Sequence, residues 1–146
     1  NDADAQYSLG KIYLQKKYNN YNINKALHFL HLSAKQNNNR ANFILGVIYQ
    51  KGKHVQQDIN RAIKYYKEAS NANNFMAKNN LGCIYLDGIG VKKNISFAIE
   101  YFNENILKDN DILSAYNLAR IYYFGIGCNK DVHKSIELTI KYLINL

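Results

Sequence analysis

Apolar residues recur along this chain with the period of an amphipathic helix, and the same pattern returns four times. In each copy an alanine or serine lies four residues before a leucine, and an isoleucine and a tyrosine follow that leucine after three and four residues. This i, i+4, i+7, i+8 spacing predicts a helix with one apolar face, whose leucine, isoleucine and tyrosine we expect in the core. The leucines are Leu9, Leu45, Leu81 and Leu118, spaced by 36, 36 and 37 residues.

A second helix is predicted after each first one. Thirteen residues beyond each tyrosine comes another small residue, and an Asn or Asp lies four residues before it, where its side chain can cap a helix. The predicted caps are Asn22, Asp58, Asn94 and Asp131. The predicted helices are residues 3–16 and 23–36, 40–51 and 59–71, 76–87 and 95–107, and 112–124 and 132–145.

A period of this length with two helices per copy predicts an all-α solenoid of four antiparallel helix pairs. We expect one repeat domain over residues 1–146, with copies at about 2–38, 39–74, 75–110 and 111–146, cut from a longer array. Copies three and four turn between their helices at Gly-Ile-Gly, which indicates helix termination, since no strand precedes it and no Gly-Lys-Ser/Thr follows. Copy one has Lys16 and Tyr18 in place of these glycines.

The net charge of +8 is concentrated in the first half of the chain. Residues 1–74 hold 11 Lys/Arg and 4 Asp/Glu, a net charge of +7, whereas residues 75–146 hold 8 and 7. An acidic protein partner or a nucleic acid would explain this bias. A solvated surface in a lysine-rich proteome explains it as well.

The residues that carry chemistry in enzymes show no convergent pattern here. Cys83 and Cys128 fit as small apolar residues and have no metal-ligand spacing. His28 and His31 are three apart on a helix, but their equivalents in other copies are Lys64 with Lys67 and Glu100 with Asn103, positions expected to point outward. We therefore predict no metal, no cofactor and no enzymatic activity. No uncharged run approaches the ~20 residues of a membrane span, and the sequence indicates no compartment.

The pattern A-x-x-x-L-G-x-I-Y, then G-x-G-V, a polar cap and A-I-x-Y-Y resembles that of Sel1-like repeats, relatives of tetratricopeptide repeats. Copies two and three match most closely, whereas copy four has Ala119 for the glycine and Leu138 and Thr139 for the aromatic pair. The resemblance implies a right-handed α-solenoid whose first helices line a concave face. It also implies an adaptor that assembles protein complexes. The alternative is a helical-repeat module that binds RNA through the basic half.

First-helix positions that differ between copies are the candidates for partner binding, because positions alike in all copies serve the core. In a solenoid of this kind they form one stripe on the concave side, rich in the aromatic and arginine side chains that dominate binding energies. We expect an extended peptide or partner helix there, with acidic groups toward copies one and two and apolar groups toward copy four. This first-helix stripe comprises Tyr7, Lys11, Arg40, Phe43, Val47, Lys51, Asn79, Cys83, Tyr116, Arg120, Tyr123 and Phe124.

The last predicted helix is apolar on more than one side. Terminal repeats need a polar outer face to stay soluble. We therefore expect Ile136, Ile140 and Leu143 to be covered by further repeats or by self-association with another chain.

Overall fold

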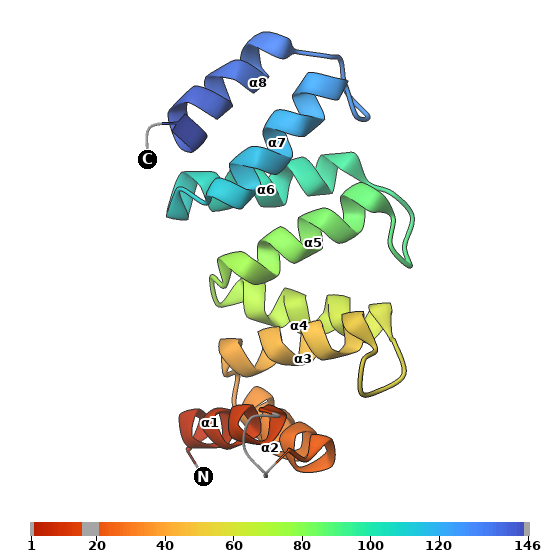
Figure 1. Ribbon diagram of the computed structural model, residues 1–146, viewed down its shortest axis with the longest axis vertical. Helices are drawn as coiled ribbons and strands as arrows, with labels where there is room; N and C mark the ends of the chain where they lie inside the picture. Colours follow the sequence, from red (N-terminus) through yellow and green to blue (C-terminus); the bar gives the residue numbers. More distant parts are fainter. Residues whose placement is uncertain (1, 16–20, 145–146) are drawn as a thin grey trace. The chain divides into compact units, whose positions relative to one another are not determined.

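The computed structural model describes residues 2–15 and 21–144, which form helices and connecting loops and contain no strand (Figure 1). Within them lie eight α-helices, and the last is followed by one π-helical turn. The all-α prediction is confirmed, and a helix lies in each of the eight predicted segments. Residues 16 and 145, where two of the predicted helices end, lie outside the described residues. The helices are α1 (Ala3–Leu14), α2 (Ile23–Lys35), α3 (Asn39–Lys51), α4 (Ile59–Asn71), α5 (Phe75–Asp87), α6 (Ile95–Asp109), α7 (Ile112–Phe124), α8 (Val132–Thr139) and η1 (Ile140–Ile144).

The helices pack in pairs within two compact units, Asn1–Ala77 and Lys78–Leu146, called unit 1 and unit 2 below. In unit 1, α1 packs against α2, and α3 packs against both α2 and α4. In unit 2, α5 meets α6 where Gly82 faces Phe102, and α7 packs against both α6 and α8. Figure 1 shows that the two helices of each pair run in opposite directions. The prediction of a single domain stays a prediction.

Polar side chains start each helix. The four predicted caps are confirmed, because each accepts a hydrogen bond from the backbone N–H three residues later, at 2.9–3.1 Å. A second series, which the sequence analysis did not predict, caps the first helices of the pairs. Its members are Asp2, Asn38, Asn74 and Asp111, each three residues before the first small residue of its copy.

Helix ends are set by residues that adopt left-handed backbone conformations. First helices end at glycine, as at Gly52 with φ 62° and Gly125 with φ 66°. In copy one, α1 ends instead at Gln15 in an extended conformation, and Lys16 and Tyr18 lie outside the described residues. Second helices are followed by Asn37, Asn73 and Asn110, all with positive φ. Asparagine tolerates this region better than other non-glycine residues, which gives part of the high asparagine content a structural reason.

Glycine in the first helix lets the second helix approach closely. A Cβ on Gly46 would lie 2.5 Å from Cε1 of Tyr66, and one on Gly82 would lie 2.5 Å from Cε1 of Phe102. Gly10 has Leu30 in the same place. Copy four has Ala119 at this first-helix position and Thr139 opposite, so a small side chain replaces the large one where the glycine is absent.

The tyrosine of each first helix lies between two side chains of the second helix. On one side an aromatic ring stacks on it in three copies, with centroids 5.7–6.3 Å apart: Tyr13 with Phe29, Tyr49 with Tyr65 and Tyr85 with Tyr101. On the other side lies the residue before the small one, which is a cation in three copies and Phe97 in the remaining one. These cation–π and ring contacts fix the second helix against the first.

The core prediction was wrong for copy one. Leu45, Leu81 and Leu118 are fully buried, but Leu9 is 39% exposed and Ile12 is 44% exposed. Helix α3 lies between α2 and α4, whereas α1 packs against α2 within the described part of unit 1. The apolar face that α3 buries is therefore left open on α1.

Candidate partner-binding surface

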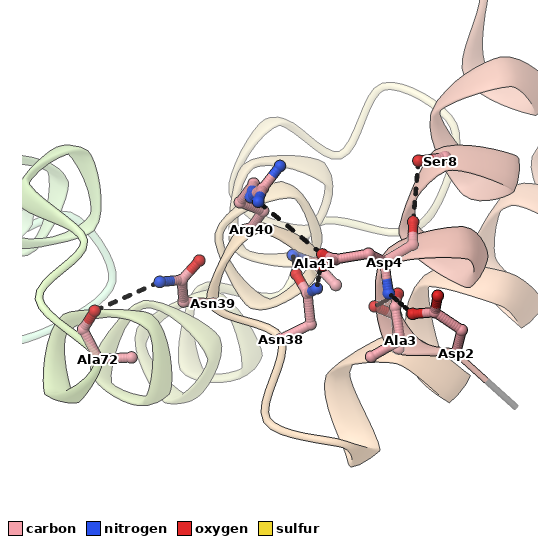
Figure 2. A network of polar contacts seen from close by, with 10 residues as sticks. Asp2, Ala3, Asp4, Ser8, Asn38, Asn39, Arg40, Ala41 and Ala72 are labelled. Carbon is pink, nitrogen blue, oxygen red and sulfur yellow. Dashed lines mark hydrogen bonds and ion pairs between the residues drawn. The ribbon is translucent and has the colours of Figure 1, made fainter.

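In unit 1, the stripe residues near the start of α1 and α3 are held by contacts within the protein. The Asp4 carboxylate accepts a hydrogen bond from Asn38 at 2.8 Å and pairs with the Arg40 guanidinium at 3.9 Å (Figure 2). The same guanidinium lies 5.6 Å from the ring centre of Tyr7, and the Lys11 ammonium lies 5.5 Å from that ring. Tyr7 thus presents its ring between two exposed cations, one of which already has a carboxylate partner.

The other unit 1 residues of the stripe differ in exposure. Phe43 and Val47 are half-buried, and the Phe43 ring lies 6.0 Å from that of Tyr66. Lys51 is exposed at the end of α3. Unit 1 therefore offers a cationic surface with aromatic side chains inset in it, which suits acidic groups better than a purely apolar segment.

Two stripe residues of unit 2 are used by the fold itself. Asn79 is buried, and its Oδ1 accepts hydrogen bonds from Asn117 Nδ2 at 3.2 Å and from Ser114 Oγ at 3.5 Å. Cys83 is half-buried beside the core of unit 2, and burial raises the pKa of its thiol. Asn79 therefore serves the hydrogen-bond network of unit 2, and Cys83 packs beside its core.

The remaining four stripe residues come together on α7. Tyr116, Arg120, Tyr123 and Phe124 line one side of a cavity of about 330 Å³, and α8 and η1 supply Ser135, Thr139 and Leu143 on the other. Three of the rings are exposed, and Phe124 is 66% exposed. Tyr123 and Phe124 meet edge to face at 4.9 Å, and the Arg120 guanidinium lies 5.7 Å from the ring centre of Tyr116. The result is an apolar cavity with an arginine at its edge.

The cavity exists because copy four lacks a large residue. Thr139 occupies the position where Leu30, Tyr66 and Phe102 cover the first helix in the other copies. Its hydroxyl donates to the Ser135 carbonyl at 2.8 Å, and the chain continues as the π-helical turn η1. In unit 2, Phe102 belongs to the core cluster, whereas nothing among the described residues fills the corresponding volume beside Thr139.

The prediction that His31 points outward was wrong. It is half-buried on α2, with Nε2 3.3 Å from the Tyr49 hydroxyl and Nδ1 3.1 Å from the Tyr65 hydroxyl. Burial, reinforced by the positive charges of Arg61 and Lys35, lowers its pKa. His28 is exposed, and no group of three metal-ligating side chains occurs among the described residues. The sequence signal that could have located His31 is the stacked pair of Tyr49 and Tyr65 in the next copy, because both hydroxyls contact its ring.

The geometry agrees with comparisons to known proteins. The family model for the Sel1 repeat matches residues 3–38, 39–74, 76–104 and 112–141, so the chain belongs to the Sel1 repeat family. Repeats of this family generally serve as protein–protein interaction modules on a scaffold fold without catalytic activity. A search of curated proteins gives no match.

Solved structures share the fold. A Sel1 repeat protein from Oxalobacter formigenes is 27% identical, with a TM-score of 0.86 over 96% of this chain. The c5321 protein, a protective antigen of uropathogenic Escherichia coli with an SLR fold, is 27% identical, with a TM-score of 0.86 over 99% of this chain. A Sel1 repeat protein from Klebsiella pneumoniae is 19% identical with a TM-score of 0.65 and supports the fold alone. The chain spans 57% and 31% of the length of the first two.

None of the helices in the described ranges combines the length and the apolar character needed to cross a membrane.

Proposed function

We propose that this chain is a protein-interaction scaffold that binds a segment of a partner protein through its first helices. An apolar side chain of the partner enters the α7–α8 cavity, and acidic groups of the partner meet the cations beside Tyr7. The observation that carries this proposal is the cavity itself, because its lining joins four stripe residues to an unfilled apolar volume. Aromatic side chains and arginine at a concave apolar site are the usual anchors of protein interfaces.

The shape of the cavity indicates what enters it. In the other three copies a leucine, a tyrosine or a phenylalanine of the second helix occupies the corresponding place. A leucine or aromatic side chain of a partner would complete copy four in the same way. Arg120, at the edge, would pair with a carboxylate next to that anchor in the partner sequence.

The test is an anisotropy titration with a fluorescein-labelled peptide that has a glutamate-rich segment and a segment containing leucine and phenylalanine, joined by a flexible linker. We expect Tyr116→Ala to weaken binding by about 2 kcal/mol, the magnitude of an interface hot spot. Thr139→Phe should weaken binding as well, because the new ring fills the cavity. Leu107→Ala is the control, since Leu107 on α6 is exposed and lies outside the stripe.

The proposal fails if Phe43→Ala and Tyr116→Ala each leave affinity within about 0.5 kcal/mol of the wild type. A single-stranded RNA competitor distinguishes the alternative. RNA that binds with a steep loss of affinity in salt, while the peptide does not bind, would indicate a nucleic-acid module instead.

A further inference from the structure

A second and larger cavity lies in unit 1, among α2, α3 and α4. Its volume is about 630 Å³, and it is built from polar and charged side chains around Asn42. None of the first-helix stripe residues lines it. It is therefore a separate feature from the α7–α8 cavity, and its role does not depend on the function proposed above.

Asn42 has no hydrogen-bonding partner for its side chain among the described residues, although it is only 5% exposed. Other copies satisfy this position. Gln6 accepts a hydrogen bond from Gln36 Nε2 at 2.7 Å, and Lys78 pairs with Glu104 at 2.7 Å. Its polar atoms still reach solvent through the cavity that Asn42 lines, so a polar group bound there can replace their contact with water.

The charges around Asn42 indicate the sign of that group. Lys35 of α2 and Lys64 of α4 line the cavity, and neither ammonium forms an ion pair with a described residue. Glu68 is the single carboxylate in the lining. Unit 1 as a whole holds 11 Lys/Arg and 4 Asp/Glu, which adds a positive potential that attracts anions.

The neutral part of the lining is fixed in place. His31 and Tyr65 line the same cavity and are hydrogen-bonded to each other at 3.1 Å, and His31 also reaches the Tyr49 hydroxyl. These contacts hold the wall between α2 and α4. An anion between the two lysines would therefore lie against a wall that is already in place, with the Asn42 amide as its hydrogen-bond donor.

We propose that this cavity binds an oxyanion, a carboxylate or phosphate group, between the ammonium groups of Lys35 and Lys64 with Asn42 Nδ2 donating to it. Both groups present oxygens that accept charge-assisted hydrogen bonds from lysine. A cation is disfavoured because two ammonium groups face one carboxylate. Copy two has Glu68 at the position of Glu104, but no described residue accepts from Asn42, so the oxyanion supplies the acceptor that the Asn42 amide lacks.

The experiment titrates the protein separately with inorganic phosphate and with an acetylated triglutamate peptide at constant ionic strength. The Asn42 side-chain amide is followed by two-dimensional ¹H–¹⁵N NMR. We expect one of the two probes to shift this signal with saturation, and the stronger probe identifies the source of the oxyanion. If neither probe shifts the signal, the proposal is overturned.

Variants separate this site from general attraction to a basic surface. Lys35→Gln with Lys64→Gln should weaken binding of the stronger probe at least about tenfold. Backbone amide shifts measure the affinity of each variant. Asn42→Leu should do the same, and Ala115 at the equivalent position of copy four shows that an apolar residue suits this place in the fold. The charge-matched control, Lys51→Gln with Lys53→Gln, should change affinity less than about twofold. An equal loss in the control pair would overturn the proposal.

Discussion

One pair of facing residues distinguishes the three copies whose two helices pack closely from copy four, which has a cavity between its helices. Where the first helix has glycine, a leucine, tyrosine or phenylalanine of the second helix lies directly on it. Where it has Ala119, the facing residue is Thr139, and a cavity remains. A Cβ at Gly46 would meet the Tyr66 ring at 2.5 Å, closer than side chains pack, so the large residue needs the glycine. Close packing and the candidate binding cavity thus depend on the same position.

His31 makes the stability of unit 1 depend on pH. Its pKa is lowered from 6.5 by burial, then by Arg61 and Lys35, while the Tyr49 and Tyr65 hydroxyls contact both ring nitrogens. The unfolded chain therefore binds more protons than the folded one between the lowered pKa and about 6.5. The free energy of unfolding should fall as the pH is lowered from about 7 through this window.

The variant His31→Gln should reduce this pH dependence. Glutamine keeps a donor and an acceptor near the two tyrosines but does not titrate. Urea titrations of both proteins between about pH 7.5 and pH 5 measure the effect, with exposed His28→Gln as the control. A wild-type pH profile that His31→Gln leaves unchanged would contradict the assignment.

At the scale of the helix, the sequence predicts what depends on local spacing. Caps such as Asn94 and Asp131, and the helix bounds around them, follow from residues three or four positions apart, which is the geometry of one helical turn. The copies also align without gaps up to Asn110. The fold class and the four helix pairs could therefore be inferred from the pattern alone.

The cavities could not be inferred in that way. Each depends on facing residues in different helices, Ala119 with Thr139 in one case and Asn42 with the lysines of α2 and α4 in the other. Comparison between copies also misled for His31, because its equivalents Lys67 and Asn103 are surface residues. The position of Asn79 holds a different residue in the other copies, which predicted a surface residue. Asn79 is nevertheless buried, because its amide belongs to a hydrogen-bond network of unit 2.

The same leucine position should contribute differently to stability in two helices. Leu45 in α3 is fully buried, whereas Leu9 in α1 is 39% exposed. Leu45→Ala should lower the free energy of unfolding by roughly 2–5 kcal/mol through lost burial and the cavity left behind. Leu9→Ala should cost less than about 1 kcal/mol. Denaturant titrations compare the two, and a loss below about 1 kcal/mol for Leu45→Ala would contradict the alignment of the copies.

For the whole molecule, the two units offer different chemistry to partners. Unit 1 has a net charge of +7, Tyr7 between two cations, and the polar cavity around Asn42. Unit 2 is nearly neutral and has the apolar cavity of α7 and α8. A partner with separate acidic and apolar segments would match both units. Salt should then weaken the contacts with unit 1 and leave the apolar anchor largely unchanged.

The exposed apolar side chains of α8 and η1 should drive self-association. Ile136 and Ile140 are 52% and 49% exposed, and Leu143 is half-buried. On α6 the equivalents are Ile99, Asn103 and Ile106, and the two isoleucines pack in the core cluster to which α7 contributes Ala115, Leu118 and Ile121. The apolar side chains that α7 covers on α6 thus have exposed equivalents in the last pair. Burying apolar surface is favourable at about 25 cal/mol per Å².

We therefore expect the chain to associate with a second copy as its concentration rises, and to bind a hydrophobic dye when dilute. Ile136→Ser with Ile140→Ser should abolish association and weaken dye binding, because it removes two exposed isoleucines of α8 and η1 while the rings of the α7–α8 cavity stay exposed. Leu107→Ser on α6 is the control, since Leu107 is 83% exposed but lies outside α8 and η1. Sedimentation velocity at several concentrations measures the association. A strict monomer that binds no dye would contradict this prediction.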